Sequence, residues 1–196
     1  MSISKSKHRT QSSDGQQRET FHTSRLLEFA STKELCAQTG HEVHDWPLVI
    51  LKELVDNALD ACEEAGIAPE IAVSVDDSGI TVVDNGPGIP AETIDGILDF
   101  SVRVSSREAY VAPDRGAQGN ALKTIIAMPF ALTGSAGEIT IDTSRDCHQI
   151  TVQMDRIRQE PVISRAIEAG FVKNGTSITV RWPESGCLMD DCGNGN

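Results

Sequence analysis

Residues 46–65 have the signals that begin and end a long helix, and this helix limits what the rest of the chain can form. Asp45 stands at the N-cap position, Pro47 falls in the first turn, and Gly66 follows the last residue. The apolar positions recur at helical spacing and predict one buried stripe, formed by Leu51, Val55, Ala58 and Cys62. A helix with a single apolar stripe packs that stripe against other elements, so the chain must form a core that covers it.

The segment that follows has the alternation of β-strands. Apolar residues alternate over 71–75, and Asp77-Ser78-Gly79 then turns the chain into the apolar run 80–83, which predicts a hairpin. The same alternation predicts a second hairpin and a last strand, over 138–143, 149–154 and 176–182.

Shorter helices are predicted where a polar cap or a proline precedes an apolar run. These helices span 25–30, 32–39, 90–98 and 120–128. The last of them is expected to end near Pro129, and one or two helical turns are expected after Pro161. Residues 99–118 mix Ser, Arg and Gly and are predicted to form a long loop.

The composition predicts one globular domain with polar ends. The chain has 196 residues, of which 39% are hydrophobic, and this is enough for a sizeable core. Residues 1–20 are rich in Ser, Gln and charged residues and predict a disordered basic tail, whereas 183–196 predict a polar C-terminal tail. The domain is therefore expected over residues 21–182.

Charge and hydropathy exclude several functions. The net charge is −12 although residues 1–25 are basic, so an acidic body that binds no nucleic acid directly is expected. The longest uncharged apolar stretch, 125–132, is too short to cross a membrane, and no secretory signal follows the first residues. The five cysteines are scattered and suit reduced thiols, which together with the missing signal predicts a cytoplasmic protein.

Three polar residues of the long helix share one face. At about 100° per residue, Asn57 lies about 40° from Glu53, and Asp60 lies about 20° from it on the other side. This face is either an ordinary solvated surface, which Glu64 also shares, or part of a polar site.

Two glycine-rich segments favour a site. Asp84 ends an apolar strand directly before Gly86 and Gly88, where a carboxylate can accept a hydrogen bond from a purine amine while the glycines let the backbone approach the ring. Residues 115–120 (Arg-Gly-Ala-Gln-Gly-Asn) open a helix whose N–H groups can bind phosphate. Lys123 is expected in the first turn of that helix, where an anion would offset its unfavourable position.

These segments resemble the three nucleotide-binding boxes of the GHKL ATPases, a family that includes the ATPase subunit of DNA gyrase, heat-shock chaperone ATPases, sensor histidine kinases and MutL. The boxes are Glu-Leu-Val-Asp-Asn-Ala-Leu-Asp-Ala, Asp-Asn-Gly-Pro-Gly-Ile-Pro and Gly-Ala-Gln-Gly, at residues 53–61, 84–90 and 116–119. Ser105-Ser106-Arg107 and the following Arg115 to Gly119 are similar to segments of the ATPase subunit of topoisomerase VI. Residues 119–124 look more like the second glycine box of MORC-type ATPases, with Ala121 in place of its last glycine.

The resemblance implies the α+β fold of this family, a two-layer α/β sandwich with a mixed, mostly antiparallel sheet that helices cover on one face. It implies that Glu53 is a general base, that Asn57 ligates Mg²⁺, that Asp84 binds adenine and that residues 99–118 form a lid. The other residues that it implies around the nucleotide are Asp60, Gly86, Gly88, Ile89, Ser105, Ser106, Arg107, Gly116, Gln118, Gly119, Asn120 and Lys123.

The implied function is Mg²⁺-dependent ATP binding and hydrolysis that gates a homodimer or a partner subunit, such as a DNA-cleaving one. Because no transducer domain follows in this sequence, the isolated chain is expected to be mainly monomeric and to hydrolyse ATP slowly. Two alternatives stay open. One is phosphotransfer of the histidine-kinase type, against which Glu53 and the lack of an upstream phospho-acceptor helix argue, and the other is a nucleotide sensor that does not hydrolyse ATP.

Overall fold

A computed structural model describes residues 22–24, 29, 31–103, 116–134, 136–157 and 160–181. Its elements, in chain order, are β1 (His22–Ser24), α2 (Thr32–Thr39), the 3₁₀ turn η1 (Val43–Asp45), α3 (Trp46–Glu64), β2 (Ala72–Asp76), β3 (Gly79–Val83), α4 (Ala91–Leu98), β4 (Ser101–Arg103), α5 (Gly116–Thr133), β5 (Ala136–Thr143), β6 (Asp146–Asp155), β7 (Glu160–Ala169) and β8 (Thr176–Arg181).

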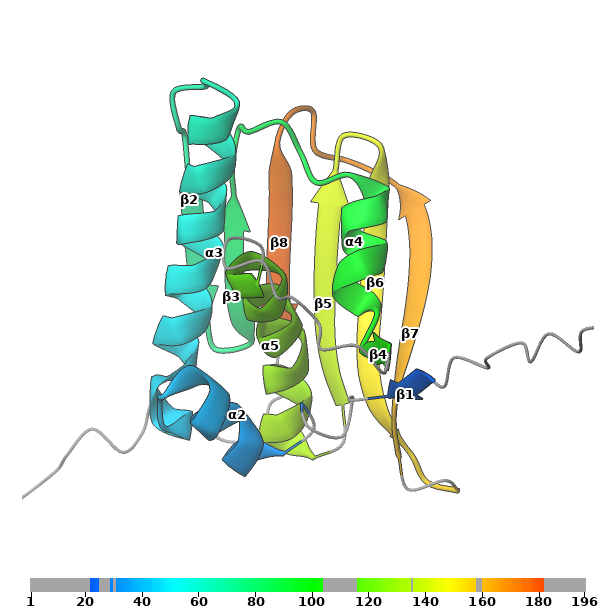
Figure 1. Cartoon of the computed structure of the whole chain (residues 1–196). Helices are drawn as coiled ribbons and strands as arrows, with labels where there is room; N and C mark the ends of the chain where they lie inside the picture. Colours follow the sequence, from blue (N-terminus) through cyan, green and yellow to red (C-terminus); the bar gives the residue numbers. More distant parts are fainter. Residues whose placement is uncertain are drawn as a thin grey trace, which may run out of the picture.

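Six of the strands form one sheet, in the order β2-β3-β8-β5-β6-β7 (Figure 1). The helices α3, α5 and α4 lie together on one face of this sheet. Strands β1 and β4 form a separate two-stranded sheet. The predicted two-layer α+β sandwich is confirmed, and among the described strands every pairing is antiparallel.

The core lies between the sheet and the helices. Strand β5 shows the expected period of two, since Ile139 and Ile141 are buried under the helices while Glu138 is exposed. Strands β3, β6 and β8 contribute alternate residues to the same core in the same way. The two predicted hairpins, β2–β3 and β5–β6, and the last strand are therefore confirmed.

Helix α3 matches the predicted long helix, with two differences. Asp45 makes no side-chain cap hydrogen bond, because the turn η1 leads directly into the helix and Asp45 already has helical backbone angles. The fully buried positions are Trp46, Ile50, Leu54, Ala58 and Cys62. Leu51 and Val55, which were predicted in the buried stripe, are only partly buried and pack against the core from its side, whereas Ile50 and Leu54 take the buried positions.

Helix α5 is longer than predicted and continues past Pro129 to Thr133. The proline costs a helix about 3 kcal/mol or more. Burial on both sides of it offsets this cost, since Met128 and Phe130 are both almost fully buried. The helix ends instead at Gly134, whose positive φ lets its N–H bond to the carbonyl of Phe130.

The predicted helical turns after Pro161 are wrong, because this segment is strand β7. It pairs along its whole length with β6, and Pro161 stands opposite Met154 near one end. Strand β7 is at the edge of the sheet, where a residue without an N–H group is tolerated.

The predicted loop 99–118 is shorter at both ends, since β4 occupies Ser101–Arg103 and α5 already begins at Gly116. The predicted helices 32–39 and 90–98 are confirmed as α2 and α4. The two tails and, except for Phe29, the helix predicted over 25–30 lie outside the described residues. No helix in the described part of the chain has the length and apolar run that a membrane crossing requires.

Candidate functional site

Helix α3 presents Glu53 and Asn57 toward the interior of the helical layer and Asp60 toward the surface. The Glu53 side chain is 34% exposed and Asn57 is half-buried, whereas Asp60 is exposed. The neighbouring Lys52 forms an ion pair with Asp56 at 2.6 Å, and its Nζ atom lies 3.8 Å from Glu53 Oε1. Glu53 and Asn57 are therefore partly covered, whereas Asp60 is open to solvent.

The side chain of Asn57 has a buried polar atom that makes no hydrogen bond to the described residues. Its Nδ2 atom is buried and has no hydrogen-bond partner among the described residues. Leaving a buried amide unpaired costs about 1–3 kcal/mol, and the two ends of an Asn amide are assigned by their partners. As assigned, the NH₂ group would be satisfied by an acceptor such as a phosphate oxygen. With the two ends of the amide exchanged, the oxygen takes this position, and it is a ligand that suits Mg²⁺. The described residues contain no cluster of three or more His, Cys, Asp or Glu side chains that could hold a metal. A magnesium ion here fits the usual pattern in which one or two protein oxygens bind it and phosphates and waters complete the shell.

Asp84 is fixed at the end of β3 by the neighbouring strand β8. Its backbone N–H donates to the carbonyl of Thr176 at 2.9 Å. Its Oδ1 atom accepts hydrogen bonds from the backbone N–H groups of Gly86 at 2.8 Å and Thr176 at 3.2 Å. The Oδ2 atom has no partner among the described residues, so one carboxylate oxygen is left for a ligand.

Burial raises the pKa of the Asp84 carboxyl above its ordinary value, and the two backbone hydrogen bonds to Oδ1 lower it by less. A raised pKa means that this carboxylate takes up a proton at a higher pH than an exposed aspartate does. Loss of its negative charge would remove an acceptor, so the ability of Asp84 to bind a donor is expected to fall earlier on acidification.

The glycines after Asp84 stand where other residues would not fit. A Cβ atom on Gly86 would lie 2.9 Å from Asp84 Oδ1 and 3.4 Å from the sulfur of Cys62. Gly88 has a φ of +83°, which L-residues with side chains rarely adopt. Asp84 itself is half-buried, and the two glycines allow the tight path of the chain beside it.

Sequence reasoning missed two residues that shape this site, Gly175 and Thr176. Gly175 has a φ of +79°, and a Cβ atom there would overlap the carbonyl oxygen of Asp84. Thr176 is buried and exchanges hydrogen bonds with Asp84 as described above. The glycine directly before the last strand was the available signal, but nothing in the local pattern connects it to a carboxylate on β3.

Asn85 has a structural role beside the site. Its side chain donates to the carbonyl of Ala68 at 3.0 Å and accepts the N–H of Glu70 at 2.9 Å. The thiol of Cys62 donates to the same Oδ1 atom at 3.4 Å. Asn85 thus joins the end of α3 and the loop after it to the loop after β3.

The second glycine-rich segment is the first turn of α5 and not a loop before it. The backbone of Gly116, Gln118, Gly119 and Asn120 therefore forms the start of this helix. Lys123 lies about two turns inside, so the expectation that it stands in the first turn is wrong. Its Nζ atom donates to the carbonyl of Asp99 at 2.5 Å and lies 5.5 Å from the ring centroid of Phe100.

Of the remaining predicted residues, one packs against the core and three lie outside the residues that the structure describes. Ile89 is partly buried and packs against the core. Ser105, Ser106 and Arg107 lie outside the described residues. No finding tests their predicted contacts with a nucleotide, which stay predictions.

A hollow of about 530 Å³ lies beside Glu53. It is bounded by α2 and the loop after it, by α3 and by α5, and its lining includes Thr39, His41, Glu53, Ala121 and Thr124. The carboxylate of Glu53 therefore borders a space large enough for water and a small ligand group.

Comparison with known proteins identifies related sequences. Residues 42–186 match the protein family described as histidine kinase-, DNA gyrase B-, and HSP90-like ATPase. Over 138 residues the chain is 33% identical to the B subunit of the type 2 DNA topoisomerase 6 of Archaeoglobus fulgidus, a match that covers 67% of this chain and 23% of that protein. The same subunit of Natronomonas pharaonis is 37% identical over 138 residues, which is 65% of this chain and 17% of the relative. The chain therefore spans less than a quarter of the length of these relatives.

Proposed function

The chain belongs to the family of histidine kinase-, DNA gyrase B- and HSP90-like ATPases, and we propose that it binds ATP with Mg²⁺ and hydrolyses it. The observations that support this most directly are two unused polar atoms, one on Asp84 and one on Asn57. Asp84 offers a free carboxylate oxygen at the end of β3, and Asn57 offers a buried amide without a partner on α3.

Asp84 is proposed to bind the adenine ring. Its Oδ1 atom is held by two backbone N–H groups, so Oδ2 has a fixed position from which to accept the exocyclic amine. Gly86 supports this position, because any side chain there would press on the Oδ1 atom of Asp84 and displace the carboxylate.

Glu53 is proposed to act as the general base. Its carboxylate borders the hollow between α3 and α5 and can accept the proton of a water molecule whose oxygen attacks the γ-phosphorus. The bond to the bridging oxygen breaks, and ADP and phosphate leave. Asn57 would hold Mg²⁺, which neutralises charge on the phosphate oxygens when bound.

The proposal for the assembly is that ATP binding gates contact with a second copy or with a partner subunit. The relatives are named as subunits of a type 2 DNA topoisomerase, which supports a partner that cleaves DNA. Pairing of β1 with β4 supports the gating, because it joins the N-terminal segment to the segment that follows α4.

Replacing Asp84 with Asn is expected to weaken ATP binding at least about tenfold, since an amide donor would face the adenine amine and an unpaired buried group costs roughly 1–3 kcal/mol. Isothermal calorimetry with the folded variant measures this. Asp77→Asn is the matched control, because Asp77 is an exposed residue on the β2–β3 turn and makes the same change of charge. Unchanged affinity in Asp84→Asn would remove Asp84 from the site.

Replacing Asn57 with Ala is expected to abolish the part of the ATP affinity that depends on Mg²⁺. Calorimetry with and without a chelator should give the same affinity for this variant and different affinities for the wild-type protein. Thermal unfolding serves as the control, and no loss of stability is expected because the Nδ2 atom has no partner to lose. A variant that keeps the full Mg²⁺ effect would contradict the assignment.

A further inference from the structure

Strand β2 is at the edge of the six-stranded sheet, and its outer side has no partner among the described residues. Asp76 stands opposite Gly79 across a two-residue turn, so these two residues form a hydrogen-bonded pair. Hydrogen-bonded pairs alternate along an antiparallel ladder, so the bonds between β2 and β3 are made by this pair, by Ser74–Thr81 and by Ala72–Val83. The bond from Asp84 N–H to Thr176 agrees with this, because it shows that the even-numbered residues of this chain segment face β8. The N–H and C=O groups of Val73 and Val75 therefore point away from β3, in the plane of the sheet, toward its open edge.

The same two valines have apolar side chains that the fold does not cover. They stand opposite Val82 and Ile80, which are buried under the helices, so they lie on the helix-covered face of the sheet. Yet Val73 is 48% exposed and Val75 is 47% exposed. At this edge, the same two residues thus have backbone N–H and C=O groups that point away from the sheet and apolar side chains that are about half exposed.

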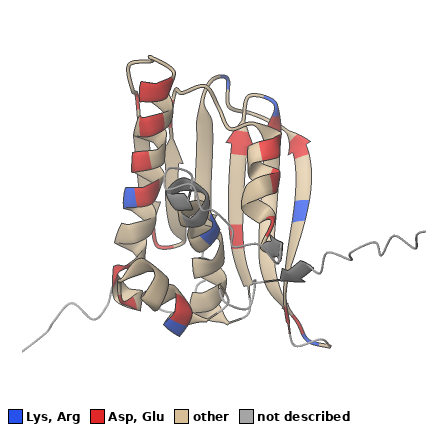
Figure 2. Ribbon diagram, viewed as in Figure 1, with Lys and Arg blue, Asp and Glu red and all other residues tan. Residues whose placement is uncertain are grey.

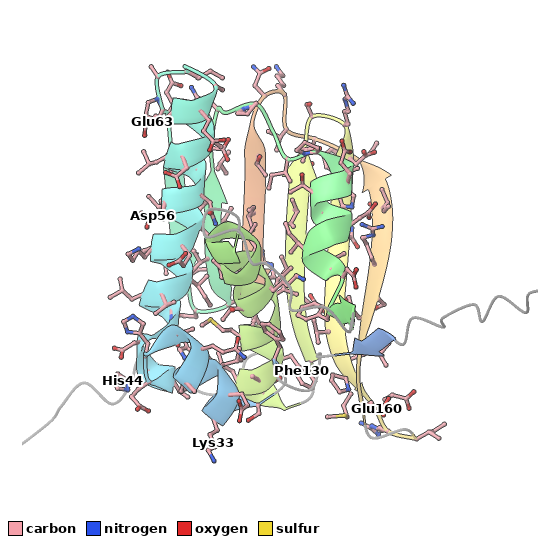
Figure 3. All side chains as sticks on the ribbon, in the orientation of Figure 1. Lys33, His44, Asp56, Glu63, Phe130 and Glu160 are labelled. Atoms are coloured by element: carbon pink, nitrogen blue, oxygen red, sulfur yellow. The ribbon has the colours of Figure 1, made fainter. Side chains whose placement is uncertain are left out.

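The surroundings of this edge are acidic. From residue 53 to residue 102 the sequence has twelve Asp and Glu residues and no Lys or Arg. Figure 2 shows the acidic residues along α3, at the β2 end of the sheet, and Figure 3 shows Asp56 and Glu63 on the outer side of this helix. Asp76 and Asp77 close the hairpin itself, Arg181 donates to Ser78 at the turn, and Lys52 on α3 is paired with Asp56.

We propose that the outer edge of β2 binds an extended segment of a partner protein in which aliphatic residues alternate with Lys or Arg. The segment adds a strand to the sheet, exchanges hydrogen bonds with Val73 and Val75, and packs its aliphatic side chains on theirs. Its basic residues face the acidic surroundings. A second copy of this chain would bring the same acidic edge, and like charges oppose that pairing, so the partner is a different, basic chain.

The test uses the labelled peptide Lys-Val-Arg-Val-Lys-Val and the full 196-residue chain, with fluorescence anisotropy at physiological salt. Saturable binding is expected, and the double variant Val73→Ser/Val75→Ser should weaken it by about tenfold or more because two partly buried valines lose their packing. The matched control is Ile167→Ser on β7, the opposite edge strand, where an isoleucine is similarly exposed and no change is expected.

Two N-methylated peptides separate strand addition from attraction by charge. In an antiparallel sheet, two residues that stand opposite each other have their side chains on the same face. The peptide valines, whose side chains pack on Val73 and Val75, therefore stand opposite them, and their amides form the hydrogen bonds. Methylation of the valine amides is expected to abolish binding, and methylation of the Lys and Arg amides to preserve it. Hydrogen exchange of the Val73 and Val75 amides should slow when peptide is added.

Absence of binding would overturn the proposal, as would equal binding of both methylated peptides or of Lys-Ser-Arg-Ser-Lys-Ser. ATP affinity is measured in the same variants and is expected to be unchanged, because Val73 and Val75 are outside the candidate nucleotide site. Failure of peptide binding therefore leaves the proposed ATPase function unaffected, and loss of ATP binding leaves this edge unaffected.

Discussion

Replacing Glu53 with Gln is expected to lower the rate of ATP hydrolysis by about 10²–10⁴ and to change ATP affinity little. The amide keeps the size of the side chain beside the hollow but cannot accept a proton from water. Because a general base acts mainly in the transition state, binding and chemistry should separate. Release of labelled phosphate measures hydrolysis, and calorimetry measures binding.

The matched control for this variant is Glu63→Gln, an exposed glutamate on the same helix. It should keep the wild-type rate. Hydrolysis by Glu53→Gln at that rate would rule out Glu53 as the base. If the wild-type protein transfers the label to itself or to another protein and releases no phosphate, it acts as a kinase, and if it binds ATP without either reaction, it acts as a sensor.

Replacing Gly175 with Ala is expected to impair both folding and nucleotide binding. The new Cβ atom would overlap the carbonyl oxygen of Asp84, so β3 and β8 must separate where they hold the carboxylate. Together with the unfavourable φ of +79°, we expect a loss of about 2 kcal/mol or more in the free energy of unfolding. ATP affinity should fall at least about tenfold, since Oδ2 loses its fixed position.

Gly66→Ala separates the two causes. Gly66 also has a positive φ, of +66°, but a Cβ atom there would meet no atom within 4 Å. Its replacement should therefore cost only the backbone strain, roughly 1–2 kcal/mol, and leave ATP affinity unchanged. Chemical denaturation and calorimetry compare the two variants, and equal effects would show that contact with Asp84 plays no part.

The sequence predicted the strands better than the ends of the helices. Alternating apolar residues identified both hairpins, because each strand has one buried face. The helix end at Pro129 was wrong because a local preference was outweighed by burial of Phe130, which only the packing of α5 on β5 reveals. Strand β7 was missed for a related reason, since pairing with β6 decides its conformation and its own residues do not.

The candidate site was predictable only where its residues are close in sequence. Glu53 and Asn57 share a helix face and Asp84 stands directly before two glycines, but the helix face alone also fits a solvated surface, and the resemblance to the ATPase family supplied the predicted roles. Gly175 and Thr176 are far from Asp84 in the chain, and only the pairing of β3 with β8 connects them. Asn85 was not identified because its role is to join two loops, which has no sequence pattern.

The small sheet of β1 and β4 joins residues 22–24 to the segment that follows α4. Residues 22–24 pair with residues 101–103, and Phe29 packs edge-to-face against Phe100 with ring centroids 5.0 Å apart. Phe100 also lies under the amino group of Lys123. A truncation that removes residues 22–24 or Phe29 therefore removes contacts made next to α5, and it alters the helical layer as well as the end of the chain.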